Sequence, residues 1–375
     1  MRFGWIFLML TFLLLGCSQP KPEFAEWYAK HKGPKTGEYD ASKLREISVR
    51  SDTFRIDSIY MSMHGPESYR EFTAAGDDDL IWVVGYSVKV KAVSTGEESD
   101  IDFMCHNNIR TNNPYLYPWG PGGVDYYNRF FTLTQGYESA SLPEGFGIPI
   151  PGSEVFHVDF QALNLNYAPI DTLVVQEVVL KYFLDSEIDF PIKPLMFHPI
   201  WVRMKYAGPP GDFGDPIPDI VSNQSMANRE LFSNVQQPSC GIEMLASGDD
   251  SRYFDDYGRI FTGHWKMPPG EELLVYDMTK MLGLKENRTL HKLIPHVHAH
   301  CEYIEVIDLT ANDTIIRCEM ESFSHKHGLK KIEDFTSAEG VVFDKSHKYQ
   351  FVSYYNNTTP DTITAMSVIH LFFAM

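Results

Sequence analysis

The sequence predicts an all-β protein built from two jelly-roll-like β-sandwich domains in tandem. Short runs of β-branched and aromatic residues recur along most of the chain, and Gly, Pro, Asn and Asp separate them. Clear runs of this kind occupy 80–93, 155–165 and 172–183. Long amphipathic helical periods are scarce, and we expect one short helix, over 277–284. This distribution is typical of antiparallel sandwiches.

Length and composition agree with two folded domains. The chain has 375 residues, of which 43% are hydrophobic, and this is enough apolar material for real cores. Its formal net charge is −18. A nucleic-acid partner is excluded as the main function, because no basic stripe is available to neutralise phosphates.

The N-terminus carries a targeting signal. Arg2 precedes a short apolar run over 5–15, which is too short for an ordinary membrane span. The run ends in Leu14-Leu15-Gly16-Cys17, which resembles a bacterial lipobox. The resemblance implies cleavage before Cys17, lipid on its thiol, and a protein anchored in the bacterial cell envelope outside the cytoplasm. An ordinary signal peptide or signal anchor is the alternative.

Composition then divides the chain into five segments. The signal peptide covers 1–17, and a polar stretch rich in Lys, Pro and Glu over 18–45 is expected to be a tether. The first sandwich is expected over 46–206. Gly and Pro cluster over 207–219, which is typical of a linker, and the second sandwich follows over 220–375.

Four cysteines remain once Cys17 is assigned to lipid. In an oxidising compartment they can form two bridges in three connectivities, or stay as free buried thiols. Cys301 and Cys318 flank a hairpin expected to turn at 311–313, so a bridge between them is one alternative. The four are Cys105, Cys240, Cys301 and Cys318.

The most informative stretch is Pro-His-Val-His-Ala-His over 295–300. It predicts a strand on which His296, His298 and His300 share one face, because alternate strand residues point the same way. Imidazole is the commonest protein ligand for copper and zinc. Two other interpretations stay open: a histidine-rich face without metal, and a three-histidine zinc site. Three rings splayed along a line reach one ion poorly, which disfavours zinc.

Three motifs occur in order in the second half. His-Trp-Lys-Met-Pro-Pro-Gly-Glu begins at His264, His-Val-His follows at His296, and Tyr355-Asn356-Asn357-Thr358 leads into Ala365-Met366-Ser367. This order resembles the catalytic half of the copper type II, ascorbate-dependent monooxygenases, which include peptidylglycine alpha-hydroxylating and dopamine beta-monooxygenases. The resemblance is specific in the second half and loose elsewhere.

The resemblance implies a copper site made by His296, His298 and Met366. Two imidazoles and a thioether suit copper(I), the form that meets oxygen. It further implies ascorbate as reductant and hydroxylation of a small-molecule or peptide substrate. His300 and Tyr355 are expected to support the ligands without touching the metal, although His300 in a changed ligand set stays open. The alternative for Met366 is an ordinary core methionine.

The first half departs from the family pattern. The family holds a second, electron-storing copper there with three histidines. The matching segment here keeps His106, with Cys105 beside it, and Gln161 stands at the position of the later histidine. His157 lies four residues away, about 13 Å along a strand, too far to substitute. We therefore expect a degenerate first site.

Two functions follow as hypotheses. One is a membrane-anchored copper protein that hydroxylates a substrate at a single copper site. The other is a non-catalytic binding lipoprotein on the same scaffold. The architecture also resembles the peptide N-glycosidase F group, whose chemistry needs carboxylates in an interdomain cleft, and no local motif marks them. His264 and His370 are expected to be structural or to line a cleft, and His325 and His327 to be solvated.

Overall fold

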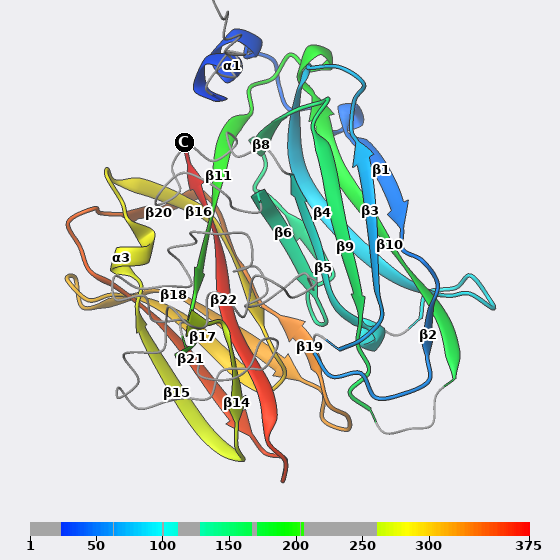
Figure 1. Cartoon of the computed structure of the whole chain (residues 1–375). Coiled ribbons are helices and arrows are strands. Elements are labelled where there is room, and N and C mark those ends of the chain that lie inside the picture. Colours follow the sequence, from blue (N-terminus) through cyan, green and yellow to red (C-terminus); the bar gives the residue numbers. More distant parts are fainter. Residues whose placement is uncertain are drawn as a thin grey trace, which may run out of the picture.

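The computed structural model describes residues 24–62, 64–99, 101–111, 128–166, 171–202, 204–205 and 261–375. The described chain is almost entirely β, which confirms the predicted fold class (Figure 1). Its helical elements are short: α1 (Phe24–His31), η1 (Ala41–Lys43), η2 (Ile101–Phe103), η4 (Asp185–Glu187) and α3 (Thr279–Leu282).

The first half folds as two facing sheets. A four-stranded sheet has the order β3-β9-β5-β6, and the other is part of a large sheet in which β1, β10, β4 and β8 are neighbours. Short strands β2 and β7 pair at β10 and β4. The bounds are β1 (Arg45–Arg50), β2 (Phe54–Ile56), β3 (Glu67–Thr73), β4 (Leu80–Ala92), β5 (Met104–Thr111), β6 (Asn128–Thr134), β7 (Ser139–Ser141), β8 (Phe146–Pro151), β9 (Val155–Ala162) and β10 (Thr172–Leu184).

The second half repeats this arrangement. A five-stranded sheet has the order β15-β21-β17-β18-β19, and the large sheet continues through β11, β22, β16 and β20, with β14 paired to β22. A small β12-β13 pair stands apart. The bounds are β11 (Lys193–Trp201), β12 (Met204–Lys205), β13 (Phe261–Thr262), β14 (His264–Met267), β15 (Gly270–Asp277), β16 (Arg288–Val297), β17 (Cys301–Asp308), β18 (Asp313–Ser322), β19 (Leu329–Ile332), β20 (Phe335–Phe343), β21 (Tyr349–Asn357) and β22 (Ile363–Ala374).

Strand β11 joins the halves. It lies within the segment predicted as the first sandwich, 46–206, but pairs along seven positions with β22, from Leu195 opposite Ala374 to Trp201 opposite Val368. Its contact with β8 is a short parallel pairing of two positions. One buried apolar cluster therefore runs through both halves. The predicted linker over 207–219 lies outside the described residues.

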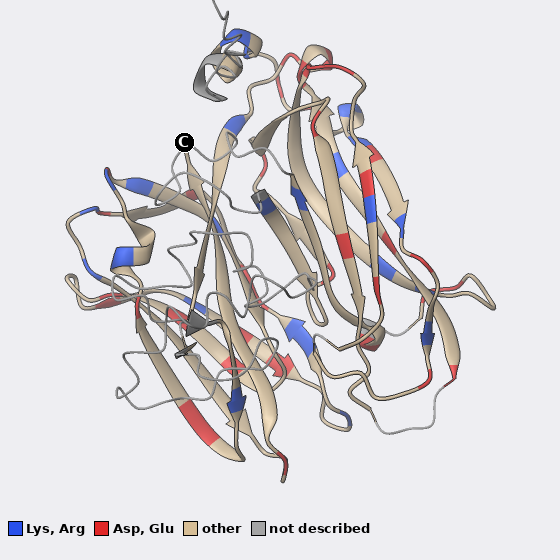
Figure 2. Cartoon of the chain, in the orientation of Figure 1, with Lys and Arg blue, Asp and Glu red and all other residues tan. Residues whose placement is uncertain are grey.

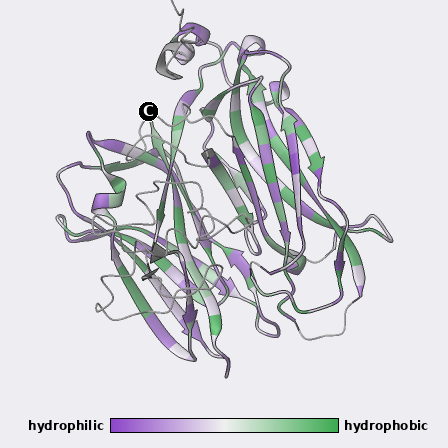
Figure 3. Ribbon diagram, viewed as in Figure 1, coloured by the Kyte–Doolittle hydropathy of each residue, from purple (hydrophilic) through white to green (hydrophobic). Residues whose placement is uncertain are grey.

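The strand at the centre of the second half is apolar. β22 carries no Lys, Arg, Asp or Glu (Figure 2), and hydrophobic residues occupy most of its length (Figure 3). Ile369, Leu371 and Phe372 are fully buried. A strand covered on both faces reads as a nearly continuous hydrophobic run, because each face meets a packed layer.

The segment expected to be a tether is partly structured. α1 packs on the first half, where the Tyr28 ring meets Trp82 edge-on at a centroid distance of 5.8 Å. Lys35 Nζ donates to the carbonyls of Asp185 and Ile188 at 2.5 Å each. Part of the segment expected to be a tether therefore contacts the folded chain from Phe24 onward, where Trp27 and Tyr28 are half-buried against the core. The lipobox and Cys17 lie outside the described residues.

Several predicted elements are confirmed. The runs at 80–93, 155–165 and 172–183 form β4, β9 and β10, and α3 lies within 277–284. Asn312, at φ 56°, turns the hairpin between β17 and β18. Within the described residues Cys105, Cys301 and Cys318 are free, so the bridge between Cys301 and Cys318 is absent. Cys318 pairs in register with Ile304, three positions from Cys301.

No described helix is long and apolar enough to cross a membrane.

Candidate functional site: a histidine-lined cavity between the halves

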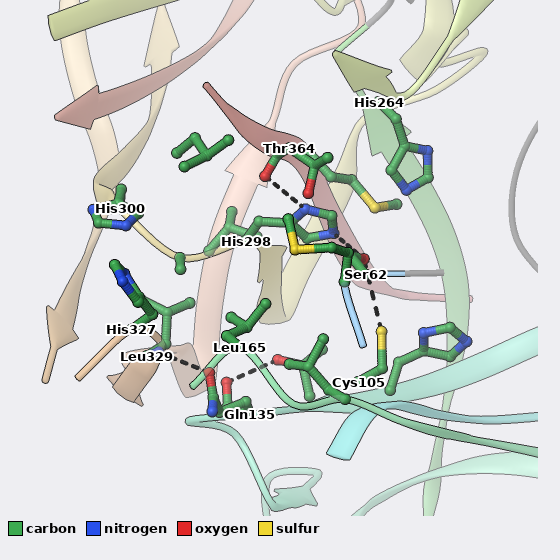
Figure 4. Close-up of a pocket in the computed structure, with 18 of the residues that line it drawn as sticks. Ser62, Cys105, Gln135, Leu165, His264, His298, His300, His327, Leu329 and Thr364 are labelled. Carbon is green, nitrogen blue, oxygen red and sulfur yellow. Dashed lines mark hydrogen bonds between the residues drawn. The ribbon is translucent and has the colours of Figure 1, made fainter. Parts of the chain in front are cut away.

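A cavity of about 190 Å³ lies between the two halves and collects the predicted site residues. Figure 4 shows part of its wall. Both halves contribute histidine and sulfur side chains, and the rest of the wall combines apolar side chains with threonines and a few other polar residues. The residues discussed below that line it are Ser62, Cys105, His106, Gln135, His264, His296, His298, His300, His327, Leu329, Asp361, Thr364 and Met366.

Strand register places several of these side chains on one face. His264 on β14 is opposite Met366 on β22, and His296 on β16 is opposite Val368. Directly opposed residues share a face, and alternate residues along a strand do too. His264, His296, Met366 and His370 therefore point the same way.

That face looks toward the first half. Phe372, two positions beyond His370, shares the face and packs on Phe131 of β6, with 5.6 Å between the ring centroids. The opposite face of β22 looks into the second sandwich, where Phe373 meets Phe343 edge-on. The histidines thus lie at the junction of the halves.

The predicted histidine strand is wrong beyond Val297. β16 ends there, His298 follows outside the strand, and Ala299 and His300 form a turn before β17 begins at Cys301. His300 has φ 73°, in the left-handed region. The chain turns here because β16 and β17 belong to different sheets. Three histidines therefore do not form a row along one strand.

His298 is held at both ring nitrogens. Nδ1 lies 3.1 Å from the Thr364 carbonyl, which can only accept, so Nδ1 carries the proton. Nε2 then accepts from the Ser62 hydroxyl at 3.2 Å (Figure 4). Burial lowers the pKa of His298 to about 4, so the ring is neutral near pH 7. A carbonyl at one nitrogen and a lone pair at the other is the usual setting of a metal-binding imidazole.

Tyr355 fixes the backbone between His298 and Met366. Its hydroxyl donates to the Met366 carbonyl at 2.5 Å and accepts from the His298 amide at 3.3 Å. The phenol is completely buried, and burial raises its pKa. Tyr355 therefore fixes the backbone positions of both His298 and Met366.

His296 is buried, with 6% of its surface exposed, and its ring stacks on His370 with 6.1 Å between centroids. The Nδ1 atoms of His296 and His370 have no hydrogen-bond partner among the described residues. A buried polar atom left unsatisfied costs about 1–3 kcal/mol. Burial, followed by the neighbouring His370, His106 and His298, lowers the pKa of His296. The neutral ring therefore keeps a nitrogen available for a ligand.

His300 lies apart from these donors. Its ring meets His327, at a centroid distance of 6.2 Å, on another part of the cavity wall (Figure 4). His327 is half-buried and its amide donates to Asn166, so it differs from the solvated loop residue that we expect. Exposed His325 agrees with that expectation.

The residues of the expected degenerate first site lie on β5 and β9. Gln161 on β9 is opposite His106 on β5, the position where the family has a histidine. Gln161 Nε2 donates to Glu67 at 2.6 Å. His157 is opposite Arg110, four residues along the strand, and contacts Tyr69. His106 and Cys105, however, both line the cavity.

The cavity wall contains donors of the types that copper(I) prefers, imidazole nitrogen and sulfur. Within the described ranges no group of three His, Cys, Asp or Glu side chains could hold a metal ion. A set of two imidazoles and a thioether is a different case, because a methionine supplies the third donor. His296 Nδ1 has no hydrogen-bond partner among the described residues, His298 Nε2 accepts from Ser62, and the Met366 sulfur is a soft donor that suits copper(I).

Ser62 and Gln135 are among the polar residues of the cavity that sequence reasoning missed. Ser62 lies in a turn of the first half and has no local motif. Gln135 Nε2 donates to Asp102 at 2.9 Å, and its Oε1 accepts from the Leu329 amide at 2.9 Å. Their roles depend on contacts with distant segments, so a single sequence gives no signal for them.

Comparison with known proteins shows no matching family model and no matching curated protein. Two solved structures are similar over most of the chain. PNGase F, a glycosylasparaginase from Flavobacterium meningosepticum, is 7% identical with a TM-score of 0.35, covering 88% of this chain and 96% of its own. PNGF-II is also 7% identical, with a TM-score of 0.35, covering 89% of this chain and 65% of its own. Likenesses this distant carry no functional argument.

Proposed function

We propose that this chain is a copper(I)-binding protein whose metal site lies in the cavity between its halves. His298, His296 and Met366 are the proposed ligands. The observation that carries the proposal is the convergence of His298, which follows β16, and Met366, on β22, in one cavity wall. Their backbones are tied directly, since the His298 amide donates to the Met366 carbonyl at 3.4 Å.

The chemistry of these residues supports copper(I) over harder metals. A thioether is a poor ligand for zinc, magnesium or calcium, and neutral imidazole suits copper. Asp361, an exposed residue, is the one carboxylate in the described cavity wall. A site with so little negative charge favours a singly charged soft cation.

Metal analysis tests the proposal. The full chain, solubilised in detergent, would be loaded anaerobically with copper(I) and desalted, and its copper content measured. We expect about one ion per chain, and large losses in His298→Ala and Met366→Leu. His325→Ala, which changes an exposed loop histidine, is the matched control. Equal copper in all four proteins would remove this site.

Hydroxylation of a substrate is the catalytic form of the proposal. Bound copper(I) would supply oxygen activation, and the cavity beside the proposed ligands has apolar walls that could receive a carbon–hydrogen substrate. Against it, Gln161 stands opposite His106 where an electron-storing histidine is required. The non-catalytic copper protein therefore stays as the alternative.

Oxygen consumption separates the two forms. With ascorbate as reductant, a working hydroxylase should consume oxygen faster as the copper-loaded wild type than as His298→Ala. Equal rates, with copper bound only to the wild type, would favour the non-catalytic protein.

We also propose that lipid on Cys17 anchors the protein in the bacterial cell envelope. The lipobox-like Leu14-Leu15-Gly16-Cys17 supports this. Detergent phase partitioning tests it: the wild type should enter the detergent phase, and Cys17→Ser should not be lipidated. A Cys17→Ser protein that still carries lipid would contradict the anchor.

A further inference from the structure

A β-bulge turns Cys105 toward the cavity. Met104 is opposite Ala162 and His106 is opposite Gln161, so β5 advances two residues where β9 advances one. Cys105 is the extra residue. In a regular strand Cys105 and His106 would point to opposite faces, whereas here both line the cavity. Bulges redirect side chains in this way, often beside functional sites.

One hydroxyl connects this thiol to the proposed copper ligand. Cys105 Sγ lies 3.7 Å from Ser62 Oγ, and Ser62 Oγ lies 3.2 Å from His298 Nε2. Figure 4 shows Ser62 between the two side chains. The Ser62 hydroxyl donates to His298, so the Cys105 thiol is the donor in the other contact. The Cys105 sulfur of the first half and the His298 Nε2 of the second half thus contact the same hydroxyl.

A second observation points to a ligand at this place. His296 is 6% exposed, lines the same cavity, and has an Nδ1 atom without a hydrogen-bond partner in the described structure. An unpartnered nitrogen at this depth calls for a hydrogen-bond partner or a metal ion. Cys105 is therefore not an isolated thiol, but one of several donors around the cavity.

We propose that Cys105, in the position that the proposed function gives to His296, is a ligand of the copper(I) ion, so that a thiolate from the first half and His298 and Met366 from the second hold one metal between them. This inference rests on the function proposed above. Thiolate and thioether sulfur select copper(I). Binding replaces the S–H bond by a copper–sulfur bond, and the thiol proton passes to solvent. The copper stays in its reduced state throughout.

In this proposal the β-bulge directs Cys105 toward the metal, and Ser62 holds His298 Nε2 until the metal binds. The metal takes the place of the Ser62 hydrogen bond at Nε2, and the Ser62 hydroxyl moves aside. A metal bonded to both halves also ties them together. This single site differs from the two copper sites of the monooxygenase family, because Cys105, a residue of the expected degenerate first site, becomes a ligand at the second site.

Copper(I) competition with a chromophoric chelator tests the inference on the full chain. We expect Cys105→Ser to weaken binding by more than about 100-fold, since loss of a supporting residue alone costs about 10–100-fold. The wild type should release one more proton per copper than Cys105→Ser. X-ray absorption should show two sulfur neighbours in the wild type and one in the variant. Cys318→Ala, which removes a buried thiol outside the cavity wall, is the control.

The outcomes separate the two proposals. If Cys105→Ser binds copper as tightly as the wild type while His298→Ala loses it, Cys105 is not a ligand and the proposed function stands. If neither substitution changes binding, both proposals fail.

Alkylation of the unchanged protein gives a test that needs no variant. Copper(I) should protect Cys105 from N-ethylmaleimide, as followed by peptide mass spectrometry. Equal labelling of Cys105 with and without bound copper would overturn the inference.

Discussion

Ser62 Oγ lies 3.2 Å from His298 Nε2, although the two residues are 236 positions apart. The bond links a turn of the first half to the segment between two sheets of the second. It fixes the tautomer of His298 together with the Thr364 carbonyl, and it occupies the nitrogen that a metal would use.

Removing the Ser62 hydroxyl should have opposite effects on stability and on copper binding. Ser62→Ala leaves His298 Nε2 without its donor, which should lower the free energy of unfolding by about 1–2 kcal/mol. Copper(I) should bind more tightly, because no hydrogen bond has to be broken. Urea unfolding and chelator competition measure the two effects.

Ser58→Ala is the control for Ser62→Ala, since Ser58 is exposed and its hydroxyl donates to Asp57. Weaker copper binding in Ser62→Ala would contradict the assignment of Nε2 as the metal-binding nitrogen.

Tyr355→Phe should loosen the ligands while keeping the ring packed. Loss of the hydroxyl removes its hydrogen bonds with the Met366 carbonyl and the His298 amide, which then keep only their long contact of 3.4 Å with each other. We expect a loss of about 1–3 kcal/mol of stability and a copper affinity about 10–100-fold lower. Thermal unfolding and chelator competition measure both.

The matched control is Tyr354→Phe, because Tyr354 is half-buried and stacks on Tyr303 away from the cavity. If the two phenylalanine variants bind copper equally well, Tyr355 has no positioning role.

Gln135 connects the two halves through hydrogen bonds with Asp102 and with the Leu329 amide. In Gln135→Ala the buried Leu329 amide and the Asp102 carboxylate each lose a hydrogen bond. We expect a loss of about 2–3 kcal/mol in the free energy of unfolding. Lys331→Ala removes an exposed ion pair with Glu333 and should change stability by less than about 0.5 kcal/mol. Urea unfolding that gives similar losses for both would contradict the role of Gln135.

Lys35 tests the docking of the N-terminal segment. Lys35 Nζ lies 3.2 Å from the Asp185 carboxylate, and the two side chains are 14% and 10% exposed. Lys35→Ala should destabilise the protein by about 1–3 kcal/mol, because it leaves a largely buried carboxylate without its cation. Lys43→Ala, at an exposed position, is the control. Equal unfolding curves for both variants would show that the segment before β1 is not docked in solution.

His347 should give the stability a pH dependence. Its hydrogen bond to Asp308, at 2.6 Å, raises the pKa of the imidazole above its usual 6.5. A pKa raised in the folded state adds stability below the unfolded pKa, and this stability is lost as pH rises through the folded pKa. His347→Gln should therefore lower the urea midpoint at about pH 5 and leave it nearly unchanged at about pH 8.

His325→Gln, at an exposed loop position, should lower neither midpoint. A His347→Gln protein that is weakened equally at both pH values would rule out the charged pair as the cause.

Local pattern predicted the strands well and failed at one decisive place. β4, β9 and β10 follow from runs of β-branched and aromatic residues, and α3 from a short polar-apolar period. The alternation in Pro295 to Glu302 equally suits a strand, yet β16 ends at Val297. The chain turns there to enter the other sheet, and a choice between sheets depends on packing that no local pattern records.

The sequence by itself determined the all-β class, the positions of most strands, and the residue types that suit a soft metal, because these depend on side-chain chemistry and on a period of two. Only the tertiary structure decided which donors meet. It placed His300 in a turn apart from His298 and brought Ser62 and Cys105 to the same cavity. It also packed Trp27 and Tyr28 against the buried apolar residues of the core. The reason is physical: contacts between segments more than two hundred positions apart arise from how the sheets pack, and one bulge at Cys105 changes which side chain faces the cavity.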